Sequence, residues 1–273
     1  MKKRTKILLY GLIGFFGLSA IWYGRNLREA DDTDQRGESH FTEDRTEPDT
    51  DAAEVSTTSS KETGTEPGGH FVLSQVSSYA GKPYVTVNDD KPFFSDKEKS
   101  STVTFETYSE MDSLGRCGTA FANLDRELMP EEERGQIGQI RPSGWHTVKY
   151  NDLIDGNYLY NRCHLIAYAL TGQNANELNL ITGTRYFNTE LMLPYELRVA
   201  RFLDHNDDHV LYRVTPYFRD DELVARGVEM EAFSVEDNGE GVCFHVFCYN
   251  VQPGIEIDYE TGENREIQNE EVR

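Results

Sequence analysis

The sequence predicts an α+β fold with a mainly antiparallel sheet, and two observations support this class. First, six runs are rich in β-branched and aromatic residues, and several alternate apolar with polar positions, which is typical of strands. Second, only three segments have a helical pattern. The predicted strands span residues 83–88, 102–107, 118–122, 209–218, 223–233 and 241–251, and the predicted helices span 71–79, 165–170 and 186–202.

Residues 1–25 predict a membrane anchor. Four positive charges precede an uncharged, mostly apolar run from Ile7 to Tyr23. A helix of these 17 residues is about 26 Å long, near the lower limit for spanning a bilayer. The flanking cations place the N-terminus in the cytoplasm and the rest of the chain outside. Because no small-x-small cleavage site follows Ser19 and Ala20, we expect an N-terminal transmembrane helix; the alternative is a cleaved signal and a secreted protein.

The rest of the chain divides by composition into three parts. Residues 26–69 are acidic and polar with hardly any large apolar side chain, so they predict a disordered acidic linker. Residues 70–260 have a globular composition and are numerous enough for one domain with a substantial core. Residues 261–273 predict an acidic tail, and we expect the chain to fray after Tyr259.

The charge of the chain limits how it can bind a polyanion. The formal net charge is −21, and residues 71–253 alone contain 16 Lys and Arg against 28 Asp and Glu. Any contact with nucleic acid must therefore rest on a local cationic patch. The candidate cations for such a patch are Arg141, Lys149, Arg162, Arg185, Arg198 and Arg201.

A histidine beside an arginine marks the candidate site. Residues 158–161 read as a short strand, and strand side chains alternate between faces, so Arg162 and His164 share one face while Cys163 points to the other. A neutral imidazole can take a proton from water at physiological pH, and a guanidinium offers donors suited to phosphate oxygens. The alternative for a lone histidine is a structural role at a strand end.

A helical segment downstream supplies oxygen ligands. Asn188 and Glu196 lie eight residues apart on the predicted helix 186–202, so both can lean over one pocket, although Pro194 between them can bend the helix. One amide oxygen with a nearby carboxylate suits Mg²⁺, which keeps several waters. The other asparagines of this region are adequately explained as helix caps and turn residues: Asn174, Asn176 and Asn179.

These motifs resemble the active-site core of the DNA/RNA non-specific endonucleases. The resemblance is carried by Asn161-Arg162-Cys163-His164 with the segment from Asn188 to Glu196, and it covers most of residues 71–259. Further similar segments are GRCGTAF, RPSGWHTVKY, NLITGTRYFN and YNVQPGIEIDY. The resemblance implies the ββα-metal (His-Me finger) nuclease fold.

The resemblance also assigns roles to individual residues. His164 matches the family's general base, Arg162 its arginine, Asn188 its metal-binding asparagine and Glu196 the acidic residue that supports the hydrated metal. Arg185 and Asn161 are candidate substrate-binding residues. This chain departs from the commoner motif Asp-Arg-Gly-His at Asn161 and at Cys163. A carboxylate role is therefore in doubt at position 161, where an amide can instead orient its neighbours through hydrogen bonds.

The function implied is a metal-dependent endonuclease that acts outside the cytoplasmic membrane. The implied substrate is DNA, with RNA as a second candidate, and the implied cofactor is Mg²⁺, for which Mn²⁺ can substitute. The implied chemistry is attack by water and products with 5′-phosphates. A catalytically inactive, membrane-tethered receptor for DNA binding or uptake is the alternative, and no protein partner can be deduced.

The four cysteines leave their pairing open. Cys117, Cys163, Cys243 and Cys248 allow three connectivities for two disulfides. A bridge between Cys243 and Cys248 is not expected, because a spacing of five puts them on opposite strand faces. Cys163 next to His164 cannot form a thiol-hydrolase dyad, because adjacent strand residues point apart, so we expect a buried apolar side chain.

Overall fold

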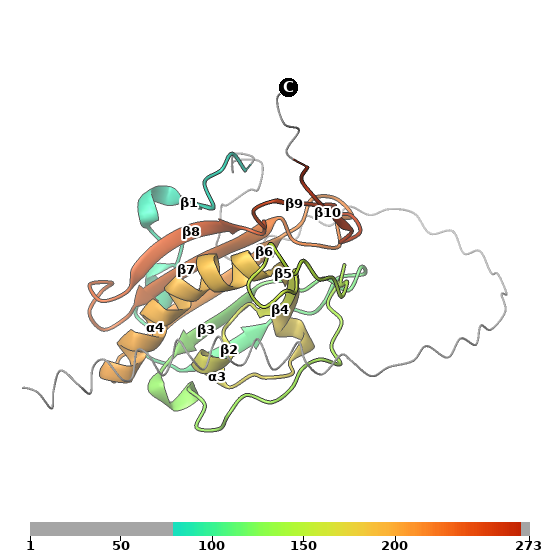
Figure 1. Cartoon of the computed structure of the whole chain (residues 1–273). Coiled ribbons are helices and arrows are strands. Elements are labelled where there is room, and N and C mark those ends of the chain that lie inside the picture. The colour runs from blue at the N-terminus through green and yellow to red at the C-terminus, as the bar shows by residue number, and fades with distance from the viewer. Residues whose placement is uncertain (1–78, 269–273) are drawn as a thin grey trace, which may run out of the picture.

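A six-stranded antiparallel sheet is the largest element of the computed structural model, which describes residues 79–268. Its strand order is β1-β8-β7-β6-β3-β2 (Figure 1). Each strand overlaps one of the six predicted runs, so these predictions are confirmed. The strands are β1 (Tyr84–Thr86), β2 (Phe105–Tyr108), β3 (Ala120–Leu124), β6 (Val210–Tyr217), β7 (Gly227–Ser234) and β8 (Cys243–Tyr249).

A second layer covers one face of this sheet. It contains a separate antiparallel strand pair and the longest helical stretch of the described residues, which crosses the sheet in Figure 1. Its elements are β4 (Tyr160–His164), α3 (Tyr168–Thr171), β5 (Leu180–Thr184), the π-helix η5 (Phe187–Met192) and α4 (Leu193–His205). The remaining short elements are η2 (Asn88–Asp90), α2 (Asp96–Lys99), η3 (Arg126–Leu128), η4 (Glu177–Asn179), β9 (Ile255–Ile257) and β10 (Asn264–Glu266).

Alternation along the central strands forms the main core. On β7, Val228, Met230 and Ala232 are fully buried against the second layer, where they join side chains of β4, β5, α3 and α4. Phe187 and Cys163 belong to the same cluster and have no exposed surface. The site-bearing elements are therefore held by the largest apolar cluster among the described residues.

The opposite face of the sheet buries a polar network. Arg213 donates to Glu231 at 2.7 Å, and His245 Nε2 lies 2.5 Å from a carboxylate oxygen of Glu229. Burial acts to lower the pKa of His245, but its hydrogen bond with Glu229 and the charge of Glu231 outweigh burial, so the pKa is raised. His245 Nδ1 also lies 2.9 Å from the carbonyl of Lys91. Because both ring nitrogens face acceptors, the imidazolium form satisfies both.

One asparagine connects the strand pair of the second layer to the sheet. Asn250, at the end of β8, accepts from the N–H of Thr184 at 2.9 Å and donates to the carbonyls of Thr182 and Ala225 at 3.0 Å each. The side chain is fully buried with these partners. The position of β5, and through it of β4, is therefore fixed against the main sheet.

The C-terminal segment is more ordered than the sequence predicts. Instead of fraying after Tyr259, the chain forms the hairpin β9–β10, which reaches residue 266. Two tyrosines hold the hairpin, because Tyr160 donates to the carbonyl of Gly262 at 2.8 Å and Tyr150 donates to Asn264 at 2.7 Å. Composition alone cannot reveal these partners, since they lie about 100 residues earlier in the chain.

Several predictions concern residues outside the described range. The membrane anchor, the linker and nearly all of the predicted helix 71–79 fall there. Within residues 79–268, no helix has the length and apolar character needed to cross a bilayer. The four cysteines lie in the described part of the chain, and no disulfide joins any two of them. Cys163 is buried in the main core, as the alternation of its strand predicts.

Candidate active site

The strand pair β4–β5 presents the predicted histidine at one end. His164 pairs with Leu180 and Arg162 pairs with Thr182, and every residue of both strands is buried. Arg162 and His164 line the same cavity, whereas Cys163 packs into the core. The two faces predicted from strand alternation are therefore confirmed.

The hydrogen bonds of His164 select one tautomer of its ring. Nε2 lies 2.9 Å from the carbonyl oxygen of Asn174, which can only accept, so this nitrogen carries the proton. Nδ1 then keeps its lone pair, and an Nη2 atom of Arg134 lies 3.4 Å from it. Burial and the charge of Arg134 lower the pKa of His164 to about 3. The ring is consequently neutral at physiological pH.

A cavity next to His164 collects the other candidate residues. Its empty volume is about 420 Å³, part of it open to solvent. Charged and amide side chains converge on it from the strand pair, from the helix η5–α4 and from the loop before β4. The lining residues are Arg134, Arg162, His164, Ala167, Tyr168, Asn188, Thr189, Leu193 and Glu196.

A π-helical turn brings Asn188 and Glu196 to the same side of the helix. The N–H of Leu193 donates to the carbonyl of Asn188, five residues earlier, and Pro194 follows in the first turn of α4. At about 100° per residue, eight α-helical residues would leave the two side chains about 80° apart. The wide turn absorbs one residue and reduces this offset to about 20°. Pro194, which has no N–H to donate, marks where the wide turn ends.

The oxygen donors of this cavity suit a hard cation. Glu196 is only 7% exposed, and Asn188 is half-buried beside it. A buried carboxylate with an amide oxygen and room for water matches the ligand preference of Mg²⁺. Asn188 and Glu196 are therefore the residues that could hold a divalent metal ion.

Arg162 contacts backbone carbonyls and an aromatic ring, which the sequence did not predict. Its Nε donates to the carbonyl of Ile140 at 2.6 Å and one Nη donates to the carbonyl of Gly138 at 2.8 Å. The guanidinium carbon lies 3.9 Å from the ring centre of Trp145, in cation–π geometry. Arg162 thus lines the cavity and, through these three contacts, also holds the loop 138–145.

The two predicted substrate-binding residues lie beside the cavity but do not line it. Arg185 begins the turn into η5, where its N–H donates to the carbonyl of Leu159 at 2.7 Å and its carbonyl accepts from Thr189 at 2.9 Å. Asn161 is 1% exposed and pairs with Gly183 across the strand pair. Within this structure both residues therefore lie close to the site without facing its cavity.

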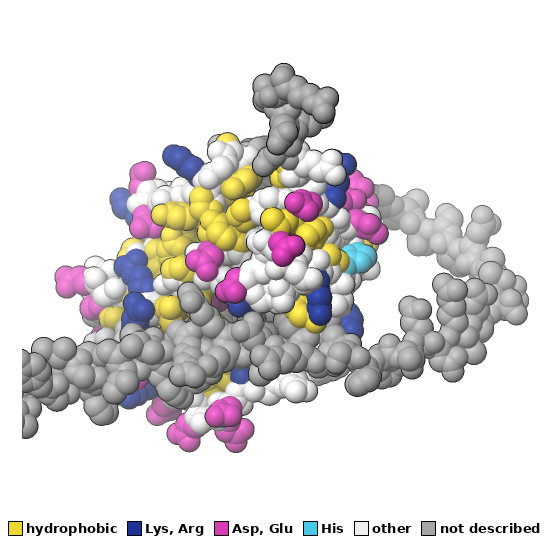
Figure 2. Space-filling view, viewed as in Figure 1, with side chains coloured by type: hydrophobic (Ala, Val, Ile, Leu, Met, Phe, Trp, Pro, Cys, Tyr) yellow, Lys and Arg dark blue, Asp and Glu magenta, His cyan; other side chains and the backbone are white. Residues whose placement is uncertain are grey.

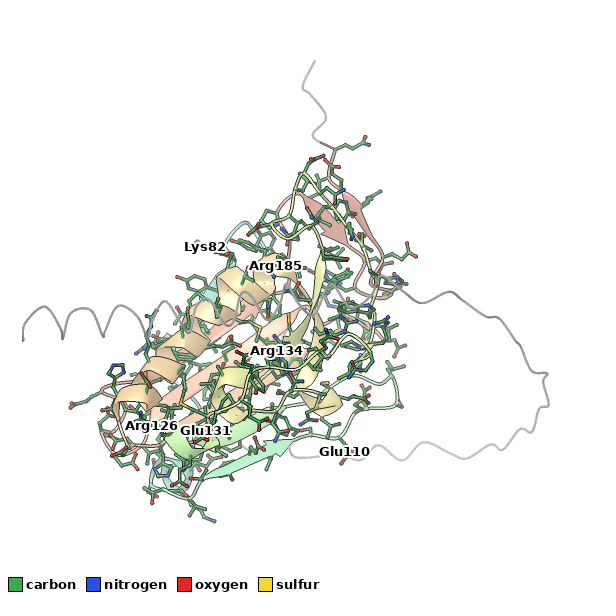
Figure 3. The ribbon with its side chains drawn as sticks, turned by 60° about the horizontal axis from the view of Figure 1, so that its bottom comes forward. Lys82, Glu110, Arg126, Glu131, Arg134 and Arg185 are labelled. Carbon is green, nitrogen blue, oxygen red and sulfur yellow. The ribbon has the colours of Figure 1, made fainter. Side chains whose placement is uncertain are left out.

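Sequence reasoning missed Arg134, a cation of the cavity whose Nη2 lies 3.4 Å from Nδ1 of His164. Figure 3 places it near the middle of the view, away from Arg185 at the start of the helical stretch. Arg134 lies in an irregular segment directly after three glutamates, Glu131 to Glu133. Because these glutamates make the segment acidic, its charge does not predict a cation at the site. The candidate cations Arg141, Lys149 and Arg198 instead contact a carbonyl or an aromatic ring outside the cavity.

The remaining surface gives limited support for a broad nucleic-acid interface. On the face seen in Figure 2, Lys and Arg side chains form separate spots among acidic and apolar ones.

A second set of buried groups with metal-binding side chains, Glu229, Glu231 and His245, lies on the opposite face of the main sheet. Its atoms already bond to one another, to Arg213 and to Tyr217, so this set is explained as a charge network.

Comparisons with known proteins agree with this geometry. A family model described as DNA/RNA non-specific endonuclease matches residues 96–236. Crystal structures of NucA from Streptococcus agalactiae, without metal and with magnesium bound, are 28% identical, cover 67% of this chain and 86% of that one, and have TM-scores of 0.58 and 0.59. The Sda1 nuclease with bound zinc is 22% identical over 68% of this chain and 97% of that one, with a TM-score of 0.54, and shows a similar fold.

Proposed function

The chain belongs to the DNA/RNA non-specific endonuclease family and is a hydrolytic endonuclease, and we propose that His164 is its general base. The proposed reaction is hydrolysis of phosphodiester bonds in DNA, with RNA as a second substrate, without strong sequence preference. The observation that carries the proposal is the bond from His164 Nε2 to the Asn174 carbonyl, which leaves Nδ1 as the basic atom beside the cavity. Asn188 and Glu196 lie in the same cavity.

The proposed mechanism uses the chain's own residues in distinct roles. His164 Nδ1 takes a proton from water, which attacks phosphorus in line with the leaving 3′-oxygen and gives 5′-phosphate products. Arg134 and Arg162 contribute positive charge next to the phosphate. Asn188 would hold a divalent cation through its amide oxygen, and Glu196 would orient water beside that cation. When bound, the cation neutralises the negative charge that develops on the phosphate and the leaving oxygen.

The preferred cation is part of the proposal. The donor atoms at Asn188 and Glu196 are oxygens, which favour Mg²⁺, with Mn²⁺ as a substitute. A crystal structure of NucA from Streptococcus agalactiae has magnesium bound, and a structure of the Sda1 nuclease has zinc bound. We therefore expect Mg²⁺ to support activity, and a metal titration with Mg²⁺, Mn²⁺ and Zn²⁺ would rank the three ions.

The proposed place of action is outside the cytoplasmic membrane. It rests on the cations and apolar run of residues 1–25, which predict export of the domain with or without a retained anchor. DNA, or RNA, in the surroundings of the cell is then the accessible substrate. The phospholipid bilayer is a partner only if the N-terminal segment is retained.

Plasmid cleavage tests the proposed function. The full-length protein is incubated with supercoiled plasmid in Mg²⁺ and, in parallel, with EDTA, and the ends of the products are labelled before and after phosphatase treatment. The proposal predicts nicking and then fragmentation only in Mg²⁺, with ends that need phosphatase before 5′ labelling. Binding without cleavage across metals and pH values would favour the inactive receptor instead. An intact His164, Arg162 and Asn188 set argues against that alternative, because binding alone needs no general base.

A further inference from the structure

The carbonyl that orients His164 lies in a short loop after α3. Gly172 ends this helix in a left-handed conformation with φ of 68°, and its N–H donates to the carbonyl of Tyr168 at 2.8 Å. Two residues later the Asn174 carbonyl meets Nε2 of His164. Because the acceptor belongs to a loop, the tautomer of the histidine depends on whatever holds that loop in place.

Glu106 on β2 ties this loop to the edge of the main sheet. One carboxylate oxygen accepts from Nε2 of Gln173, and the other accepts from the hydroxyl of Tyr108 at 3.2 Å. The Tyr108 hydroxyl also lies 3.4 Å from Oγ1 of Thr171, the last residue of α3. Burial raises the pKa of Tyr108 well above its ordinary value, so the hydroxyl keeps its proton and donates. Glu106 and Tyr108 thus hold the loop on both sides of Gly172.

We infer that Glu106 is a positioning residue for the nuclease reaction, acting through Gln173 and the backbone of Asn174 on the ring of His164. The inference rests on the proposed function. Glu106 does not line the cavity, so it has no direct contact there with substrate or metal. Its effect is to keep the Asn174 carbonyl opposite Nε2, which leaves the lone pair on Nδ1. If the loop shifts, the ring loses the acceptor that selects this tautomer.

The same loop also contacts the segment that carries Arg134. A Cβ added to Gly135 would lie 2.9 Å from Nδ2 of Asn174, so the asparagine side chain packs directly against the residue that follows Arg134. The tie through Glu106 therefore holds two features of the site together. One is the Asn174 carbonyl that faces Nε2 of His164, and the other is Arg134 beside the ring.

Kinetics of four full-length proteins test the inference: the wild type, Glu106→Ala, Glu106→Gln and the matched control Thr107→Ala. Thr107 is the exposed neighbour of Glu106, and its hydroxyl donates to the carbonyl of Phe121 at 3.0 Å, away from the loop. Glu106→Ala should lower kcat by about 10- to 100-fold and leave KM within about twofold. Glu106→Gln keeps an acceptor for Gln173 and should stay within about threefold of the wild type.

Three results would overturn the inference. The first is a kcat for Glu106→Ala equal to that of Thr107→Ala. The second is a rise in KM at constant kcat, which would make Glu106 part of substrate binding. The third is a Glu106→Gln variant as slow as Glu106→Ala, because the negative charge rather than hydrogen-bond acceptance would then matter.

A spectroscopic measurement keeps the inference testable if Glu106→Ala fails to fold or if the wild type fails to cleave nucleic acid. Nitrogen-15 NMR of labelled histidine distinguishes the Nε2–H from the Nδ1–H tautomer, and Gln173→Ala breaks the same tie from its other end. The wild type should show the Nε2–H form for His164, and Gln173→Ala should show a mixture. A pure Nε2–H form in both proteins would refute the positioning role, whereas absent cleavage by the wild type would refute the proposed function alone.

Discussion

Replacement of Arg162 separates a scaffolding role of this residue from phosphate binding. Arg162→Ala removes two charge-assisted hydrogen bonds, to the carbonyls of Ile140 at 2.6 Å and Gly138 at 2.8 Å. It also removes the cation–π contact with Trp145. Each such bond to a charged group contributes about 1.5–3 kcal/mol, so the loss in unfolding free energy should be about 4 kcal/mol. For a domain of this size the midpoint of thermal unfolding should fall by about 8–16 °C.

Arg162→Lys and Arg141→Ala make this test quantitative. Lysine keeps the charge but cannot reproduce the planar fork, so Arg162→Lys should lose about half as much stability, about 2 kcal/mol. Arg141 also donates to the Gly138 carbonyl, at 2.6 Å, but from an exposed position. Its removal should change the unfolding free energy by no more than about 0.5 kcal/mol.

Urea and thermal unfolding, measured beside KM for a defined oligonucleotide, supply the readout. The structure predicts a large loss of stability for Arg162→Ala, with the loop 138–145 released. If Arg162→Ala instead unfolds within about 1 kcal/mol of the wild type while KM rises tenfold or more, the scaffolding account is refuted. Arg162 would then act mainly on the substrate.

Three further perturbations address the core, the buried charge network and the metal. Gly183→Ala should cost about 1–3 kcal/mol in urea unfolding, because the new Cβ would lie 2.3 Å from Sγ of Cys163, and adding Cys163→Ala should restore part of the loss. The pKa of His245 is raised through its bond with Glu229 despite burial, so its contribution to stability is complete below about pH 6.5 and is lost as pH rises through the folded pKa. The midpoint of thermal unfolding should fall as pH rises above about 6.5 in the wild type, and it should fall less in His245→Gln. An equal fall in both proteins would contradict this prediction. Asn188→Ala should raise the Mg²⁺ concentration for half-maximal cleavage by about tenfold or more, and an unchanged value would exclude it as a ligand.

The main sheet could be predicted because its strands alternate or contain many β-branched residues. β6, β7 and β8 each have one apolar side against the second layer, and the sequence alone places them to within a few residues. β5 escaped prediction because Leu180–Thr184 is short, does not alternate apolar with polar residues and contains a glycine. β9 and β10 escaped because each has only three residues and because the tyrosines that bond to the hairpin lie about 100 residues earlier in the chain.

The site could be predicted in part for a similar reason. Alternation along β4 is a local property, and it places His164 and Arg162 on one face without knowledge of the fold. The π turn that aligns Asn188 with Glu196 could only be suspected from the position of Pro194 between them. Arg134 could not be found, because an irregular loop with no periodicity brings it to the cavity.

Cleavage of plasmid DNA by His164→Ala shows whether this imidazole is the general base of the reaction. The full-length variant is compared in Mg²⁺ with the wild type and with His205→Ala, a matched change at an exposed histidine near the end of α4. If His164 Nδ1 is the general base, His164→Ala should lose about 10²- to 10⁴-fold in rate while His205→Ala cuts like the wild type. A His164→Ala protein that is folded and cleaves DNA at the wild-type rate would contradict the account.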